Sequence, residues 1–327
     1  MSGVTARHFV ALDGLRGVAA LLVIFFHVPW PWPFSTHTAV RNFYLMVDLF
    51  FLLSGFVIHH AYHNRLRTTA DIAHFLLRRT FRLLPLYVFL FAIFVSLERL
   101  QGKASPNWNP PAWSLAAEFI AYGFYAFAMR LRYDQRPHLR IITIIVAVAV
   151  YAFIAMSENT LDVTGGLGAL RAVSGFIIGA ALYSASKPDA AMAEAFQVAS
   201  MAAIVLILSC AEGGSVLFVL PCFATLIWAL SPGCGLLANL LCRRGFQFMG
   251  AVSFSVYLLH YPIILQLSPH LLFMTPEAGV FVTVGFLAAV VALASLTFKW
   301  IELPFQKMGR DLSLKVMQRR LEKNGLC

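Results

Sequence analysis

An arginine and a histidine stand eleven residues apart in the first apolar segment of the chain, at Arg16 and His27. On an α-helix, which turns by about 100° per residue, this spacing returns almost to the same face and covers roughly 16 Å of the helix axis. Asp13 lies one turn before Arg16 and could pair with it. Such a stripe could hold an elongated anionic ligand at Arg16 while the other end of the ligand reaches the His27 imidazole. The simpler alternatives are a packing role for His27 and snorkelling of Arg16 to the membrane surface.

A basic cluster in the sequence FLLRRTFRLLPLY places Arg79 and Arg82 one helical turn apart. Guanidinium groups match phosphates in shape and charge, so this pair could bind a nucleotide head group. Ordinary anchoring of a membrane protein by cytoplasmic basic residues explains the cluster equally well.

Three further ionisable residues, Asp48, Glu118 and His260, fall inside apolar segments. An ionisable group within a bilayer is costly, so each of them is a candidate functional residue. Glu118 follows the Pro-rich segment that leads into Trp113 and Ser114. A Trp is common at a membrane interface, whereas a carboxylate one helical turn further in needs a partner or water.

Three histidines, His59, His60 and His63, cluster at the end of the second apolar segment. His59 and His63 are four residues apart and could together bind a metal ion. No acidic or cysteine residue near them in the sequence supports such a site, and the five cysteines of the chain show no CxxC spacing. We therefore predict no metal and an interfacial role for these histidines.

Membrane helices must position all of these residues, because 60% of the 327 residues are hydrophobic and only 12% are charged. A helix needs roughly 20 apolar residues to cross a hydrocarbon core of about 30 Å. Ten such runs occur, so we predict an all-α, polytopic membrane protein with about ten transmembrane helices. The predicted spans are 10–30, 43–62, 81–99, 113–131, 138–156, 168–186, 190–210, 214–231, 245–268 and 277–301.

The basic residues predict the orientation of these spans, because cytoplasmic loops carry the excess of Lys and Arg. With the N-terminus inside, most of the 25 Lys and Arg residues are cytoplasmic, and Arg16 and Lys299 lie within helices. The outer side then holds only Arg41, Arg99, Lys103 and Arg171. We therefore predict cytoplasmic N- and C-termini, and we attribute the net charge of +10 to topology rather than to nucleic-acid binding.

The chain shows no internal repeat and no low-complexity linker. We predict one integral membrane domain over residues 1–306, followed by a basic cytoplasmic tail over 307–327. An amphipathic helix on the inner leaflet and a solvated segment are both open for this tail.

Six segments in order resemble the acyltransferase-3 family of integral membrane O-acyltransferases. The first helix ALDGLRGVAALLVIFFH contains the family's basic residue and histidine, here Arg16 and His27. The other segments are VDLFFLLSGFVI with Asp48, FLLRRTFRLLPLY with Arg79 and Arg82, PAWSLAAEF with Trp113, Ser114 and Glu118, GAVSFSVYLLHYPII with Tyr257 and His260, and WIELPFQK with Glu302.

This resemblance implies ten helices, cytoplasmic termini, a bacterial inner-membrane location and transfer of acetyl or related acyl groups to carbohydrates. The implied donor is acyl-CoA as a co-substrate, with no tightly bound cofactor. The other partners are a carbohydrate acceptor, free or lipid-linked, and membrane lipid. The predicted catalytic residues are His27, Arg16, Asp48 and Glu118, the acyl-CoA-binding residues are Arg16, Arg79 and Arg82, and the substrate-binding residues are Trp113, Ser114, Tyr257 and His260.

In the favoured mechanism, His27 acts as the general base toward an acceptor hydroxyl, while an acyl-histidine intermediate is the alternative. Asp48 or Glu118 would orient the imidazole or the sugar. The segment between Pro85 and Trp113 is shorter than in many relatives, and no hydrolase-like domain follows the tenth span, so we expect acceptor recognition from this domain or from a partner. The rival function is a multipass transporter or flippase, in which the buried charges would line a translocation path.

Overall fold

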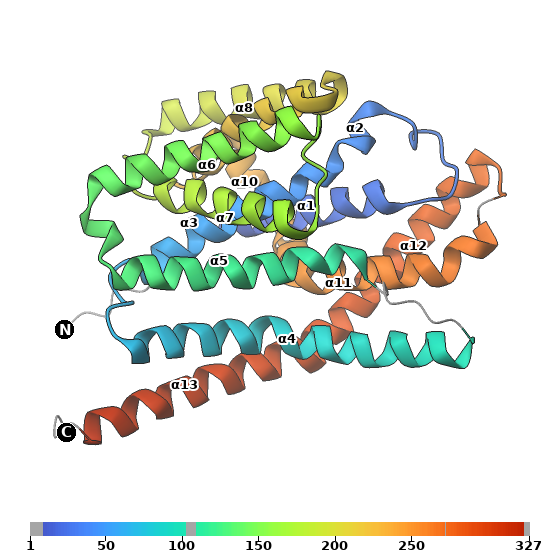
Figure 1. The fold of residues 1–327 in the computed structure, drawn as a ribbon. Coiled ribbons are helices and arrows are strands. Elements are labelled where there is room, and N and C mark those ends of the chain that lie inside the picture. The colour runs from blue at the N-terminus through green and yellow to red at the C-terminus, as the bar shows by residue number, and fades with distance from the viewer. Residues whose placement is uncertain (1–8, 103–108, 272, 324–327) are drawn as a thin grey trace.

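The computed structural model describes residues 9–102, 109–271 and 273–323, with side chains up to residue 315. Every regular element in these ranges is a helix, which confirms the all-α prediction (Figure 1). The long helices are α1 Val10–His27, α3 Met46–Tyr62, α4 Thr69–Leu100, α5 Trp113–Arg130, α6 Pro137–Ser157, α7 Gly165–Leu182, α8 Ala190–Cys210, α9 Val219–Leu230, α11 Arg244–Leu271, α12 Pro276–Thr297 and α13 Leu303–Lys323. The short elements are α2 Thr38–Arg41, α10 Leu236–Leu241, the 3₁₀ turns η1 Phe43–Leu45, η2 Pro110–Ala112, η3 Tyr133–Gln135 and η4 Gly213–Phe218, and the π-helical turn η5 Phe298–Glu302.

Nine helical segments of the described chain are long and apolar enough to cross a membrane. They coincide with nine of the ten predicted spans, and the chain is therefore a multipass membrane protein. The remaining predicted span, 113–131, corresponds to α5. This helix has 18 residues but is less apolar, because Glu118, Arg130 and two tyrosines lie along it. The orientation of the termini stays a prediction, and Lys103, assigned above to the outer side, lies outside the described residues.

Polar residues in the connections determine where several helices begin. The Thr68 hydroxyl accepts from the backbone N–H of Asp71, and the Asp71 carboxylate accepts from the Thr68 N–H, which forms a capping box at the start of α4. The preceding residue, Arg67, forms an ion pair with Asp134 of η3. The α3–α4 and α5–α6 connections are thereby joined at one end of the bundle.

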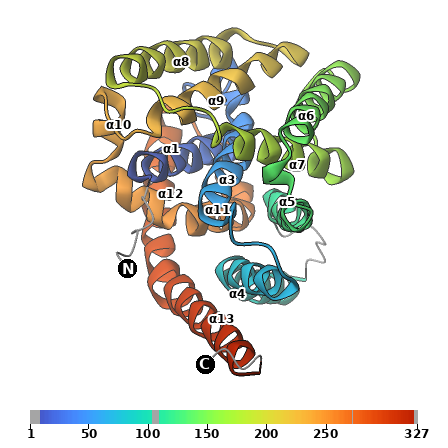
Figure 2. The ribbon, with the colours of Figure 1, turned by 90° about the vertical axis from the view of Figure 1, so that its left-hand side faces the viewer.

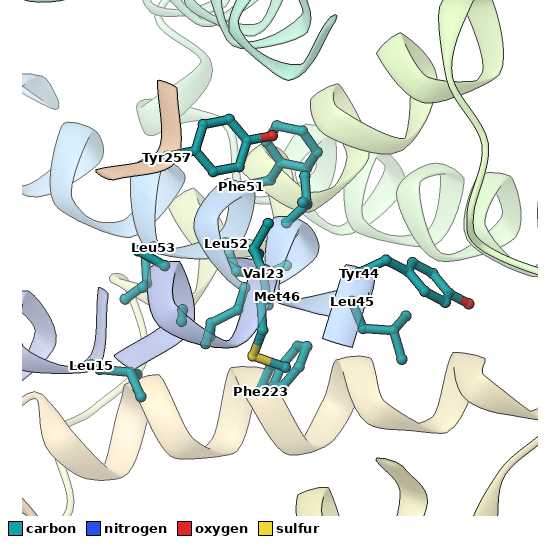
Figure 3. Close-up of a cluster of buried hydrophobic side chains, with 14 of the residues drawn as sticks. Leu15, Val23, Tyr44, Leu45, Met46, Phe51, Leu52, Leu53, Phe223 and Tyr257 are labelled. Carbon is teal, nitrogen blue, oxygen red and sulfur yellow. The ribbon is translucent and has the colours of Figure 1, made fainter. Parts of the chain in front are cut away.

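The core is built around α1, α3 and α11, with α9 packed beside them. Figure 3 shows part of this cluster, in which Val23 of α1 lies beside Leu52 of α3, while Leu15 of α1 and Phe223 of α9 belong to the same cluster. Membrane helices associate mainly through close packing, and small residues let their backbones approach.

Glycines bring α1 against α11. A Cβ atom added to Gly17 would lie 2.6 Å from the Gly250 backbone nitrogen, and one added to Gly250 would lie 2.2 Å from the Asp13 carbonyl oxygen. The two backbones therefore touch at the level of Arg16.

Helices α4 and α13 form a pair at one side of the molecule (Figures 1 and 2). The α12 helix continues through η5 into α13, which lies along α4 with Gly309 directly against the Phe81 side chain. The predicted boundary between residues 306 and 307 falls inside α13. Residues 324–327 of the predicted tail lie outside the described part of the chain.

Candidate functional site

A cavity of about 420 Å³ lies between α1, α3, α4, α5, α11 and η5. It extends from Gln247, near the first residue of α11, to Leu258. Six of the ten predicted site residues line it: Arg16, Arg79, Arg82, Ser114, Glu118 and Tyr257. The tertiary structure thus brings together residues from four separate helices, whereas His27, Asp48, Trp113 and His260 lie outside the cavity lining.

Three arginines line the part of the cavity near the start of α11. Arg16 forms the expected ion pair with Asp13, with 2.9 Å between Nη1 and Oδ1. The Arg79 guanidinium lies 5.5 to 5.9 Å from the ring centroids of Tyr62, Phe75 and Tyr122. Its Nε is buried, and among the described residues it has no hydrogen-bond partner. Arg79 thus lines the cavity with a guanidinium that lies among aromatic rings.

Two glutamates face the same cavity and are held by hydroxyl groups. The Ser54 hydroxyl donates to Glu118 Oε1 over 2.8 Å, and the Tyr122 hydroxyl donates to the same oxygen. Glu302 accepts a hydrogen bond from the Ser255 hydroxyl. With each carboxylate bound by its own donors, both are positioned as fixed acceptors in the wall.

Tyr257 lies with Leu258 at the end of the cavity that is farthest along α11 from Gln247. Its hydroxyl donates to the Pro111 carbonyl over 2.9 Å and lies 2.9 Å from the Ser114 hydroxyl. Next to it, the Asn109 side-chain amide donates to the Leu258 carbonyl over 3.0 Å. These bonds join α11 to the segment that enters α5.

Two histidines meet one helical turn beyond Tyr257. His27 Nδ1 lies 2.9 Å from the Val23 carbonyl oxygen, and His260 Nδ1 lies 2.6 Å from the Tyr257 carbonyl oxygen. His260 Nε2 lies 3.3 Å from His27 Nδ1. The helix geometry of α1 and the close α1–α11 contact thus place both imidazoles together.

These contacts determine which ring nitrogens hold the protons. A carbonyl oxygen only accepts, so Nδ1 is the protonated nitrogen in both His27 and His260. His260 Nε2 is then an acceptor beside the His27 Nδ1–H. His27 Nε2 is left with its lone pair, which is the form that a general base requires. His260 is fully buried and contacts the His27 ring, and its predicted role in substrate binding stays a prediction.

Asp48 lies in a separate buried ion pair. Arg171 donates through Nε and Nη2 to its two carboxylate oxygens over 2.6 and 2.7 Å, and the Tyr151 hydroxyl donates over 2.9 Å. The exposed fraction is 1% for the Arg171 side chain and 0% for that of Asp48. Trp113 packs beside this pair, with the Arg171 guanidinium 5.8 Å from its ring. The catalytic role predicted for Asp48 stays a prediction, and the observed contacts tie α3, α6 and α7 together.

Arg171, assigned above to the outer side of the membrane, lies within a helix rather than in a connection, and its side stays a prediction. Arg171 lies within α7, fully buried and paired with Asp48, because a guanidinium can enter an apolar interior only with a compensating charge. One signal in the sequence pointed to this pairing: Arg171 falls inside the predicted span 168–186, and Asp48 is a membrane carboxylate without an assigned partner.

Sequence reasoning missed Tyr122 and named Glu302 only as part of a motif. Tyr122 follows Glu118 by four residues on α5, so the two share one helix face and could have been paired from their spacing. For Glu302 no such local signal exists, because its partner Ser255 lies 47 residues away.

The three histidines at the end of α3 bond to neighbouring groups. His59 Nδ1 lies 3.1 Å from the Tyr125 hydroxyl, and His63 Nδ1 lies 3.0 Å from the His59 carbonyl oxygen. His60 Nδ1 lies 3.1 Å from the Tyr183 hydroxyl. Within the described ranges, no group of three His, Cys, Asp or Glu residues has the arrangement of a metal site.

Comparison with known proteins adds a family and several relatives. The sequence model of a family described as an acyltransferase domain (Acyl_transf_3) matches residues 9–298, which include all ten predicted site residues. YrhL of Bacillus subtilis is 25% identical over 97% of this chain and 58% of its own length. The peptidoglycan O-acetyltransferase OatA of Listeria monocytogenes is 24% identical over 93% of this chain and 56% of its own. BcsY of Komagataeibacter xylinus is 25% identical over 89% of this chain and 81% of its own.

The chain thus spans somewhat more than half of the length of YrhL and OatA. No solved structure matches it. The family match covers α1 to α12 and therefore the histidine pair and the three cavity arginines, whereas the cavity residues Glu302 and Gln306 lie beyond it.

Proposed function

Because the chain belongs to the acyltransferase-3 family, we propose that it is a membrane-bound O-acyltransferase that moves an acyl group, in the first instance acetyl, from acyl-CoA to a carbohydrate hydroxyl. The observation that supports this most directly is the alignment of an arginine-lined cavity with the His27–His260 pair one turn beyond its end. The name of OatA, a peptidoglycan O-acetyltransferase, supports a glycan as the acceptor class.

The arginines provide a site for the phosphates of the donor. Among the described residues, Arg79 and Arg82 form no ion pair, while Arg16 is paired with Asp13. Guanidinium groups bind phosphate oxygens through several donors at once, so Arg79 and Arg82 would take the phosphates with Arg16 close by. The acyl-pantetheine arm would then extend along the cavity toward Tyr257.

His27 would act as the general base. Its Nε2 takes the proton of the acceptor hydroxyl as the hydroxyl oxygen forms a bond to the thioester carbonyl carbon. The carbon–sulfur bond then breaks, and the proton passes from His27 to the leaving thiolate, which gives an acyl ester and free CoA thiol. Throughout, the His27 Nδ1–H stays bonded to the Val23 carbonyl, so the ring keeps its orientation.

In the predicted orientation the arginines lie on the cytoplasmic side of the histidine pair, which is the side that supplies acyl-CoA. We assign the protein to the bacterial inner membrane on this basis. The acceptor, free or lipid-linked, would approach His27 from the side away from the cavity.

Mass spectrometry of surface and secreted glycans tests the acceptor class in three strains: gene deleted, gene restored, and gene restored as His27→Ala. We expect the mass of an acyl group to disappear from a glycan on deletion and to return only with the wild-type gene. Loss of whole glycans from the surface would instead favour the transporter alternative.

The donor site predicts a specific kinetic defect. Arg79→Met and Arg82→Met should each raise the KM for acyl-CoA about 10- to 100-fold, because a hydrogen bond to a charged group is worth about 1.5–3 kcal/mol. The matched control is Arg78→Met, since Arg78 is exposed and is absent from the cavity lining. Initial rates with the purified protein in lipid vesicles give the KM for acyl-CoA of the wild type and of each variant. An equal defect in Arg78→Met would mean that the cluster acts through membrane anchoring.

A further inference from the structure

At the Tyr257 end of the cavity, a single aromatic ring separates the cavity from His260, because the Tyr257 ring lines the cavity and its centroid lies 5.7 Å from that of the His260 ring. Along α11, Tyr257 follows Gly250 by seven residues and His260 follows Tyr257 by three, which places them roughly 10 Å and roughly 4.5 Å further along the axis. Gly250 lies at the level of Arg16 through its contact with Gly17. The order from the arginines outward is therefore cavity, Tyr257 and histidine pair.

Tyr257 and Phe50 together form the wall at this end of the cavity. Phe50 of α3 lines the cavity and packs edge to face against Tyr257, with ring centroids 6.0 Å apart. Tyr257 has little freedom to move, because its hydroxyl is held by the Pro111 carbonyl and the Ser114 hydroxyl at 2.9 Å each. The Tyr257 carbonyl in turn accepts the His260 Nδ1–H. A displaced Tyr257 would therefore disturb the residue that contacts the His27 ring.

We propose that Tyr257 and Phe50 set the maximum length of the acyl group that the enzyme transfers, and that they select a short, acetyl-sized donor. This inference rests on the proposed function. The thioester must lie at the Tyr257 end of the cavity for its carbonyl carbon to meet an oxygen held at His27. An acetyl methyl group needs little space there, whereas each added methylene must enter the volume of the two rings.

The size of the effect follows from the way pockets discriminate by volume. One methylene too many or too few is worth about 10- to 200-fold in kcat/KM. The Tyr257 ring cannot turn away to make room for a longer acyl group without losing the hydrogen bonds of its hydroxyl. The wild-type protein should therefore use acetyl-CoA at least about tenfold better than butyryl-CoA.

The test compares kcat/KM for acetyl-, butyryl- and hexanoyl-CoA at one acceptor concentration in four proteins: wild type, Phe50→Ala, Tyr257→Leu and Phe254→Ala. Phe50→Ala and Tyr257→Leu should each raise the butyryl-to-acetyl ratio by about tenfold or more. Phe254 lines the same cavity one turn closer to the arginines, so Phe254→Ala removes a ring of equal size away from the wall. It should leave the ratio within about threefold, whatever its effect on the rate.

The outcomes separate this inference from the proposed function. If the wild-type protein turns over acetyl-CoA and the butyryl-to-acetyl ratio is the same in all variants, the inference about Tyr257 and Phe50 is wrong and the proposed function still stands. A wild-type protein that neither binds nor consumes any acyl-CoA overturns the proposed function itself. If Tyr257→Leu elutes as an aggregate in detergent, Phe50→Ala decides, because Phe50 makes none of the hydrogen bonds that hold the wall.

Discussion

Replacing His27 by alanine is expected to lower kcat for acyl transfer by about 10²- to 10⁴-fold, the usual contribution of a positioned general base. The dissociation constant of acyl-CoA should change little, because His27 is absent from the lining of the donor cavity. Transfer of a labelled acetyl group in lipid vesicles measures the first quantity, and equilibrium binding of labelled acetyl-CoA measures the second.

Variants of two other histidines serve as comparisons for His27→Ala. His260→Ala should cause a smaller loss, because it removes the partner of the His27 Nδ1–H and leaves the proton acceptor Nε2 in place. His270→Ala should have no effect on transfer, since His270 is exposed near the end of α11. Full turnover by His27→Ala would reject the general-base role, and a labelled acyl group recovered on His27 after acid quenching would establish the acyl-histidine alternative.

Breaking the Asp48–Arg171 pair should have the largest effect on stability. Arg171→Met is expected to lower the free energy of unfolding by about 3–5 kcal/mol, because it leaves a buried carboxylate without its cation. The double variant Asp48→Leu with Arg171→Met should recover most of this loss, since apolar groups of similar volume often replace a buried ion pair at little cost. Titration of the detergent-solubilised protein with sodium dodecyl sulfate gives the free energy of unfolding of the wild type, the single variant and the double variant.

An exposed ion pair provides the control. Arg310 and Asp311 have exposed side-chain fractions of 58% and 63%, so Arg310→Met should change the unfolding free energy by less than about 0.5 kcal/mol. The double variant also tests the catalytic role predicted for Asp48. A folded double variant with normal transfer would make Asp48 purely structural, whereas a folded but inactive one would support a catalytic contribution. Equal stability of wild type and Arg171→Met would contradict the structural account.

The sequence alone determined the helical architecture. Runs of about 20 apolar residues are a local property, and in a bilayer such a run satisfies its backbone hydrogen bonds only as a helix. The Arg16–Asp13 pair was also predictable, because both residues belong to one helix and their spacing decides whether they meet. Helix α5 is the instructive exception, since Glu118 and its neighbours serve the cavity and make the span less apolar.

Only the tertiary structure decided how the ten candidate residues divide among a cavity, a histidine pair and the surroundings of a buried ion pair, where Asp48 and Trp113 lie. His27 and His260 are 233 residues apart in the sequence, and Asp48 and Arg171 are 123 apart. Helical periodicity states which residues share a face of one helix, but it does not state which face meets which neighbour. That choice depends on the shapes of the packed helices, here on the glycines that bring α1 against α11.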